Sequence, residues 1–307
     1  MKKNKRKNKV IIVLIMLLLN SVMFGKTPFF NGDSAYQYLT KQTNFGPRNP
    51  GSNGYENCKK WLIGFAEKNS DKVELQKFIG VDPKSKEKIS MTNIIARFDP
   101  KNTERIMLSA HWDTRPWADE GNYKKDEPIL GANDGASGIA VLLHIMELLK
   151  ENDLSFGVDV VFWDGEDLGR SGHPYEFCQG SRYYSLHIIK PKPQEGIVID
   201  MIGDADLKVF FEGNSMEFNP DLMIDIWNIA SKLNYGKYFI KKYGPTMYDD
   251  HVPLSYIAGM PTIDIIDFKY PNENVNYWHT HNDTADKCSP KSLKIIGDIL
   301  IYWLYHR

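Results

Sequence analysis

Short apolar runs rich in β-branched residues alternate along the chain with segments whose apolar residues recur at helical spacing. The runs predict strands, and the helical spacing predicts amphipathic helices between them. We expect strands at Lys72–Ile79, Thr92–Phe98, Arg105–Ala110, Val158–Trp163, Gly196–Met201 and Thr262–Ile266. We expect helices at Ser137–Lys150, at Pro220–Leu233 and, capped by Ser289, at Pro290–His306. This alternation predicts one α/β domain with a mostly parallel, twisted central sheet and helices on both faces.

Acidic and imidazole side chains stand where these predicted strands end and in the loops between them. His111 follows the third strand, Glu166 and Asp167 follow the fourth, and Asp200 lies at the end of the fifth. The whole set is His111, Asp134, Glu166, Asp167, Asp200, Asp249, His251, Asp264 and His279. Because ligands bind beyond the carboxyl ends of parallel strands, we expect these side chains to surround one site.

Carboxylate oxygens and imidazole nitrogens are ligands that zinc takes in a catalytic site with one open position. Without a cation, a crowd of carboxylates would repel itself and be costly to bury. Glu166 and Asp167 are neighbours that point in different directions, so one can bind metal while the other moves protons. Taken singly, Asp134 could be a helix cap, Asp200 a turn residue and His111 a core histidine. Their joint order along the chain favours a zinc site instead.

The N-terminus carries a basic stretch, Lys2–Lys9, followed by the apolar run Val10–Leu19. This pattern is typical of an export signal, and the run is short for a membrane-spanning helix. We predict that residues 1–25 are a signal peptide or a membrane anchor formed by residues 10–24, and that residues 30–307 are the catalytic domain. That domain is then expected in the periplasm or outside the cell. A formal net charge of -1 gives no reason to expect a nucleic acid partner.

The three cysteines, Cys58, Cys178 and Cys288, are odd in number and have no spacing typical of a zinc motif. One disulfide with a free thiol is compatible with an oxidising compartment, but the sequence does not assign it. We interpret all three as structural. The histidines without a polar motif around them receive the same interpretation, and they are His144, His173, His187, His281 and His306.

The order His-x-Asp, Asp, Glu-Asp, Asp, His resembles the zinc aminopeptidase superfamily, whose motifs cover nearly all of residues 43–290. Finer motifs resemble its glutaminyl cyclase branch in the animal-type and bacterial form. Asp249-Asp250-His251-Val252-Pro253 is similar to that branch's Asp-Asp-His-Ile-Pro, and Trp278-His279-Thr280 to its Trp-His-Thr. The resemblance implies an enzyme that closes the N-terminal glutamine of peptides or proteins to pyroglutamate and releases ammonia.

Carried over position by position, the resemblance implies a single zinc ion on Asp134, Asp167 and His279. Glu166 becomes the proton carrier.

The same resemblance makes Asp200 and Asp249 the hydrogen-bonding carboxylates beside the amide and the α-amine. Trp278 and His251 become substrate-binding residues. His111 and Asp264 are left as candidates for a second metal site or for support of the first.

Three departures from the branch pattern concern the substrate pocket and the metal. Asp167 stands where animal cyclases have Glu, and Asp264 stands where they have a late His. Gly172 aligns with a pocket Trp, so we expect Tyr175 or Tyr270 to supply that wall.

An aminopeptidase with one or two zinc ions is the alternative on the same fold. Its second metal would use His111, Asp134 and Asp200, all of which are present. A non-catalytic binding domain is a more remote alternative, because such domains usually lose ligands and here none is lost.

Overall fold

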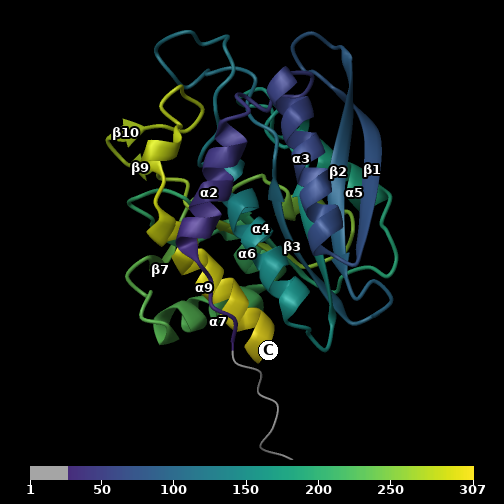
Figure 1. Ribbon diagram of the computed structural model, residues 1–307. Helices are drawn as coiled ribbons and strands as arrows, with labels where there is room; N and C mark the ends of the chain where they lie inside the picture. Colours follow the sequence, from purple (N-terminus) through teal and green to yellow (C-terminus); the bar gives the residue numbers. More distant parts are fainter. Residues whose placement is uncertain (1–26) are drawn as a thin grey trace, which may run out of the picture.

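The computed structural model describes residues 27–307 (Figure 1). The predicted signal or anchor at residues 1–25 lies outside the described residues. Within them, no helix has both the length and the apolar character that crossing a membrane would require.

A six-stranded sheet forms the centre of the molecule, in the order β1-β2-β4-β3-β5-β8. Strands β3, β4, β5 and β8 run parallel to one another, and β2 runs antiparallel to both of its neighbours. Two small sheets, β6 with β7 and β9 with β10, lie outside it. The strands are β1 Lys72–Val81, β2 Lys88–Phe98, β3 Arg105–His111, β4 Gly157–Trp163, β5 Gly196–Asp200, β6 Val209–Phe211, β7 Phe239–Tyr243, β8 Thr262–Ile266, β9 Pro271–Asn272 and β10 Val275–Asn276.

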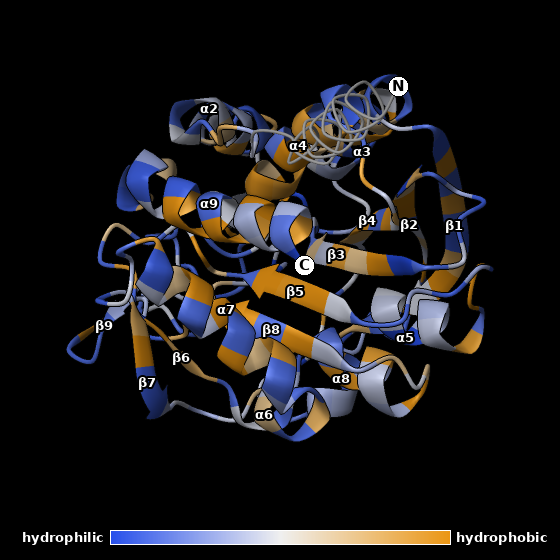
Figure 2. Cartoon of the chain, turned by 90° about the horizontal axis from the view of Figure 1, so that it is seen from below, coloured by the Kyte–Doolittle hydropathy of each residue, from blue (hydrophilic) through white to orange (hydrophobic). Residues whose placement is uncertain are grey.

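Helices cover both faces of this sheet, as Figure 2 shows in a view with the strands between two helical layers. One layer contains α2, α3, α4 and α9, and the other contains α5, α6 and α8. The helices are α2 Gly32–Thr43, α3 Asn53–Asn69, α4 Ala136–Glu151, α5 Gln179–Leu186, α6 Gly213–Phe218, α7 Pro220–Lys232, α8 His251–Tyr256 and α9 Pro290–His306, with short 3-10 turns at Pro174–Glu176 and Ala285–Lys287.

The sheet is buried on both sides, which explains the continuous apolar runs in its central strands. All residues of β3 and β4 are buried. The larger core lies between the sheet and the layer of α2, α3, α4 and α9. A smaller core, including Trp163, Tyr184 and Leu254, lies between the sheet and α5 and α8. Parallel pairing places the carboxyl ends of β3, β4, β5 and β8 at the same edge of the sheet.

The predicted fold class is confirmed: a mostly parallel sheet lies between two helical layers. The predicted strand at Thr262–Ile266 has the observed bounds, and the helix predicted at Ser137–Lys150 is one residue longer at each end. The side chain of Ser289 caps α9, as predicted, by accepting a hydrogen bond from the backbone N–H of Lys291. The helices α2, α3, α5, α6 and α8 and the strands β6, β7, β9 and β10 were not predicted.

Candidate active site

A cavity of about 310 Å³ opens beyond the carboxyl ends of β4, β5 and β8. This is the place where parallel α/β sheets bind their ligands. One part of its wall is acidic and another is aromatic or apolar. The lining residues are Asp134, Glu166, Asp167, Ser171, Gly172, Pro174, Phe177, Asp200, Met201, Met247, Tyr248, Asp249, Ile266, Phe268, Trp278 and His279.

Asp134, Asp167 and His279 form the first polar cluster, and all three are buried. His279 Nε2 lies 2.9 Å from Asp167 Oδ1 and 3.5 Å from Asp134 Oδ2. These residues come from the loop before α4, the loop after β4 and the loop before α9. The structure therefore brings together the three residues that the resemblance implies as zinc ligands.

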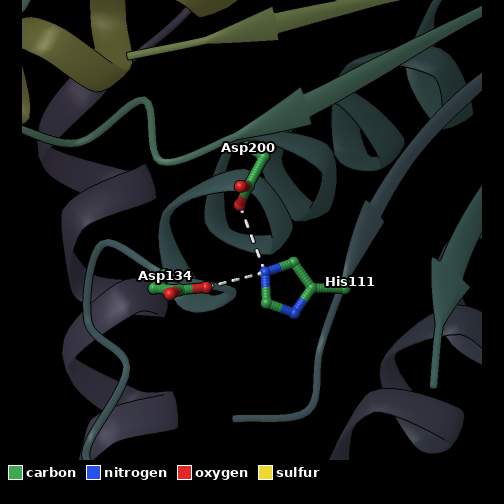
Figure 3. Close-up of side chains that lie close together, drawn as sticks. All are labelled: His111, Asp134 and Asp200. Atoms are coloured by element: carbon green, nitrogen blue, oxygen red, sulfur yellow. Dashed lines mark hydrogen bonds and ion pairs between the residues drawn. The ribbon is translucent and has the colours of Figure 1, made fainter. Parts of the chain in front are cut away.

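His111, Asp134 and Asp200 form a second cluster directly beside the first (Figure 3). His111 Nε2 lies 3.1 Å from Asp134 Oδ1 and 3.1 Å from Asp200 Oδ1. Asp134 thus belongs to both clusters, and each of its two oxygens faces a different histidine. Burial lowers the pKa of His111, but hydrogen bonds to Asp113, Asp134 and Asp200 outweigh it and raise that pKa well above its usual value.

Two buried carboxylates fix the loops that carry the first cluster. Asp113 accepts hydrogen bonds from the backbone N–H groups of Glu166 and Asp167, at 3.1 and 3.2 Å. Asp283 accepts from the backbone N–H groups of Asn133 and Asp134, at 2.8 and 3.1 Å. Each loop is therefore held by a carboxylate from a different part of the chain, and side-chain positions in the cluster depend on tertiary packing.

A buried arginine, Arg115, lies behind the same cluster. Its Nη1 donates to Asp167 Oδ1 at 3.3 Å, and its Nε and Nη2 bind the carboxylate of Asp119 at 2.6 Å each. Asp119 Oδ1 in turn lies 3.8 Å from His279 Nδ1. Burial and the charge of Arg115 lower the pKa of His279 to about 3, so the imidazole is neutral, the form that binds metals.

Glu166 lines the cavity next to the cluster, and one of its carboxyl oxygens lies within 4.8 Å of the carboxylate of Asp249. Burial, and then the charge of Asp249, raise the pKa of Glu166 well above its usual value. Cys178 Sγ lies 3.4 Å from Glu166 Oε1 and donates to it. A carboxyl group with a raised pKa, aimed into a cavity beside candidate ligands, is suited to accept and return a proton near neutral pH.

The structure corrects the prediction that His251 contacts the substrate. His251 is fully buried, does not line the cavity, and its Nε2 lies 3.1 Å from Glu212 Oε2. Asp249 does line the cavity, with His251 and the buried Asp264 behind it. The reason is that α8 begins at His251, whereas Asp249 lies in the preceding loop. The imidazole of His251 therefore points into the helical layer.

Aromatic side chains enclose the apolar part of the cavity. Trp278 stacks on the ring of His279 at 3.7 Å between centroids, and Phe268 packs against the indole at 4.9 Å. Tyr248 and Phe177 line the cavity as well. Trp278 is therefore placed to contact a bound side chain.

The expectation that Tyr175 or Tyr270 supplies the missing wall is wrong. Tyr175 is 75% exposed and contacts Tyr248 from outside, and Tyr270 is buried with its hydroxyl bonded to Asp283. Neither lines the cavity.

Sequence reasoning missed several supporting residues: Arg115, Asp119, Asp283 and Glu212. Only the spacing of Arg115 and Asp119, four residues apart, offered a local signal. The three cysteines are buried and form no disulfide within the described residues. His144 is structural as predicted, since it accepts from the backbone N–H of Asn31 and pairs with Glu147.

Comparison with known proteins places this geometry in a family. The model of peptidase family M28 matches residues 93–304, which is more than half of the chain. The chain belongs to peptidase family M28. The matched stretch runs from β2 through α9 and contains every residue of both polar clusters.

Relatives within and around this family are similar in fold and sequence. A glutaminyl cyclase of Bacteroides thetaiotaomicron, solved with N-acetylhistamine bound, is 36% identical, covers 92% of this chain and 100% of its own, and gives a TM-score of 0.86. A Zn-dependent exopeptidase from Parabacteroides distasonis is 32% identical, with 92% and 100% covered and a TM-score of 0.87. The glutaminyl-peptide cyclotransferase of Drosophila melanogaster is 24% identical over an alignment of 268 residues, which covers 78% of this chain and 71% of the relative.

The first cluster of this M28 protein fits a zinc ion on chemical grounds. Two carboxylates and one imidazole are a donor set that zinc takes in catalytic sites. Asp134 Oδ2 and Asp167 Oδ2 are buried and accept no hydrogen bond from any described residue. Buried carboxylate oxygens without partners are costly, and a cation bound between them removes that cost.

Proposed function

We propose that this chain is a zinc-dependent glutaminyl-peptide cyclotransferase that converts N-terminal glutamine of peptides and proteins to pyroglutamate and releases ammonia. One observation carries the proposal. A cavity walled by Trp278, Phe268 and Tyr248 places the carboxylates of Glu166 and Asp249 beside the cluster that fits zinc. The similarity to glutaminyl cyclases from bacteria and from an insect supports the same conclusion.

The reaction is an intramolecular transfer of an acyl group. The α-amine nitrogen attacks the carbonyl carbon of its own side-chain amide, a new C–N bond closes the ring, and the old C–N bond breaks to release ammonia. Because the nucleophile is tethered to the carbonyl, the enzyme has to fold the side chain and move a proton. The chain's own residues supply both functions.

Asp249 is placed to hold the α-amine, and Asp200 to bind the amide end, since both carboxylates line the cavity. Trp278 packs along the side chain and excludes water from it. Glu166 accepts a proton from the attacking amine and gives it to the departing ammonia. A bound zinc ion would polarise the amide carbonyl as a Lewis acid.

We propose that Asp134, Asp167 and His279 hold this ion and that one zinc is bound. The single ion rests on the resemblance of the sequence to the glutaminyl cyclase branch, and the cluster of His111, Asp134 and Asp200 is where a second ion would bind.

An aminopeptidase is the second candidate, and the second cluster favours it. His111, Asp134 and Asp200 offer a further set of metal ligands, and one similar structure is a Zn-dependent exopeptidase. A peptidase must activate water and accept many first residues. A cyclase needs a cavity in which one side chain folds back on its own amine.

Peptides that begin with glutamine, leucine or alanine separate the two candidates. The purified protein should convert the glutamine peptide to a product lighter by one ammonia, and a chelator should stop the reaction. Leucine and alanine peptides should stay intact by mass spectrometry. Release of free leucine or alanine, with the glutamine peptide uncyclised, would replace the cyclase by the aminopeptidase.

We also propose that the catalytic domain is exported and acts in the periplasm or outside the cell, either released or anchored by residues 10–24. The basic and apolar N-terminus supports this location. Cell fractionation locates the protein, and N-terminal sequencing of the mature form decides between signal and anchor. Recovery of the full chain in the cytoplasmic fraction would exclude export.

A further inference from the structure

One wall of the cavity is formed by a segment without helix or strand. Met247, Tyr248 and Asp249 line the cavity, and they lie in the loop between β7 and α8. A loop lacks the repeating backbone hydrogen bonds that fix a strand or a helix, so other groups must fix it. In this protein those groups come from the β6–α6 connection.

Glu212, between β6 and α6, supplies the main fixing contacts. The residue is 2% exposed. Its Oε1 accepts hydrogen bonds from the backbone N–H groups of Met247 at 2.8 Å and Asn214 at 2.9 Å. Its Oε2 accepts from the backbone N–H and the hydroxyl of Ser215, both at 2.6 Å, and lies 3.1 Å from His251 Nε2. Both oxygens are therefore surrounded by donors.

Neighbouring contacts tie the same two segments together. Asn214 Nδ2 donates to the backbone carbonyl of Met247 at 2.6 Å. A Cβ added to Gly213 would lie 2.1 Å from Thr246 Oγ1, so the β6–α6 connection and the loop touch directly at a glycine. Ser215 Oγ also accepts from the backbone N–H of Asp264, which joins this region to β8.

Capping of α6 accounts for only part of what Glu212 does. A cap requires the bonds to Asn214 and Ser215 at the start of the helix. The bond to Met247 and the contact with His251 lie outside α6 and flank Tyr248 and Asp249 on both sides. The carboxylate therefore holds the loop before and after the residues that face the cavity.

We propose that Glu212 is a positioning residue that fixes the Met247–Asp249 wall of the cavity and so sets its affinity for the first residue of the substrate. This inference rests on the proposed cyclase function. Glu212 does not reach the cavity, so it acts through the loop and through His251. It is not needed to hold zinc, because its contacts include none of the three proposed zinc ligands.

Glu212→Gln tests this role with almost no change in shape. The amide NH₂ can take the place of either carboxylate oxygen, and in both places it would face N–H or O–H donors. Either the hydrogen bond from the Met247 N–H or the contacts made by Oε2 are therefore lost. We expect KM for a glutamine peptide to rise about tenfold or more, with a smaller change in kcat and unchanged zinc content, because the variant alters binding geometry and leaves the metal site intact.

Glu147→Gln is the matched control. Glu147 also pairs with a histidine, His144, at 3.0 Å and accepts from a hydroxyl, that of Tyr38, at 2.6 Å. None of these residues lines the cavity. Because the Glu147 side chain is 36% exposed, the control should lower thermal stability less than Glu212→Gln does and should leave KM and kcat at wild-type values.

Asn214→Ala is the second variant, and it decides the outcome if Glu212→Gln does not fold. It removes the bond to the Met247 carbonyl without leaving a buried charge unpaired, and a smaller rise in KM is expected. Wild-type KM in a folded Glu212→Gln, or in Asn214→Ala when the former does not fold, would overturn the inference. Failure of the wild-type protein to cyclise glutamine would instead overturn the proposed function.

Discussion

Replacing Gly138 by alanine should destabilise the protein, although alanine is the better helix former. Gly138 lies in the first turn of α4, where the helix crosses β3 and β5. A Cβ there would lie 2.4 Å from the carbonyl oxygen of Ile199 and 2.8 Å from Cβ of Ala110. Both contacts are far inside normal packing distance, and one is with backbone, so α4 or β5 has to move.

The size of the effect follows from two opposing contributions. Alanine in place of glycine stabilises a helix interior by about 0.5–1 kcal/mol. Overpacking of a buried contact costs about 1–3 kcal/mol. The sum is a loss of up to roughly 2.5 kcal/mol, about 1 kcal/mol at the midpoints of the two ranges. Each kcal/mol corresponds to about 2–4 °C in Tm for a domain approaching this size.

Gly64→Ala in α3 is the matched control. Gly64 is exposed, and no heavy atom lies within 4 Å of an added Cβ. Only the helix preference remains, so this variant should gain about 0.5–1 kcal/mol. Thermal unfolding followed by circular dichroism measures both variants. A Gly138→Ala protein as stable as Gly64→Ala would show that α4 does not pack on β5 as closely as described.

The site yields further predictions. Glu166→Gln should keep zinc but lose turnover by roughly 10²–10⁴-fold, and near-normal turnover in a peptide assay would remove Glu166 from proton transfer. Asp167→Ala and His279→Ala should each lower zinc content in metal analysis, whereas His111→Ala should retain an ion; an empty His111→Ala protein would contradict the ligand assignment. Burial raises the pKa of Glu212, but His251, Ser215 and the Met247 N–H outweigh it and lower that pKa to about 2. The carboxylate therefore stabilises the fold above about pH 4.5, and this contribution disappears as the pH falls toward 2. Wild-type Tm should fall more steeply over that range than the Tm of Glu212→Gln, and parallel curves would contradict the assigned contacts.

Local patterns determined the strands of the central sheet and the helices α4, α7 and α9, whereas α2 and α3 were not predicted. The strand β4 is a continuous apolar run because both of its faces are buried, and α4 repeats its apolar residues at helical spacing, so each could be predicted to within one residue of its bounds. The helices α6 and α8 have only six residues each. A helix of that length contains less than two turns and gives no usable period, so packing against neighbouring segments decides its presence.

The chemistry of the site was also largely readable in the order of residues. Carboxylates and imidazoles at the ends of parallel strands must meet at one edge of the sheet, and Asp134, Asp167 and His279 do meet there. Side-chain direction within a loop was not readable. Asp249 and His251 stand two residues apart, yet one faces the cavity and the other faces Glu212.

Only the tertiary structure decided what supports these groups. Asp283 binds the backbone of Asp134 across 149 residues of sequence, and Glu212 binds that of Met247 across 35. Hydrophobic periodicity can be read from a short stretch of sequence, because the polarity of each residue indicates whether that same residue is buried. The partner of a buried carboxylate depends on which distant segments the folded core brings within hydrogen-bonding distance, and no local pattern carries that information.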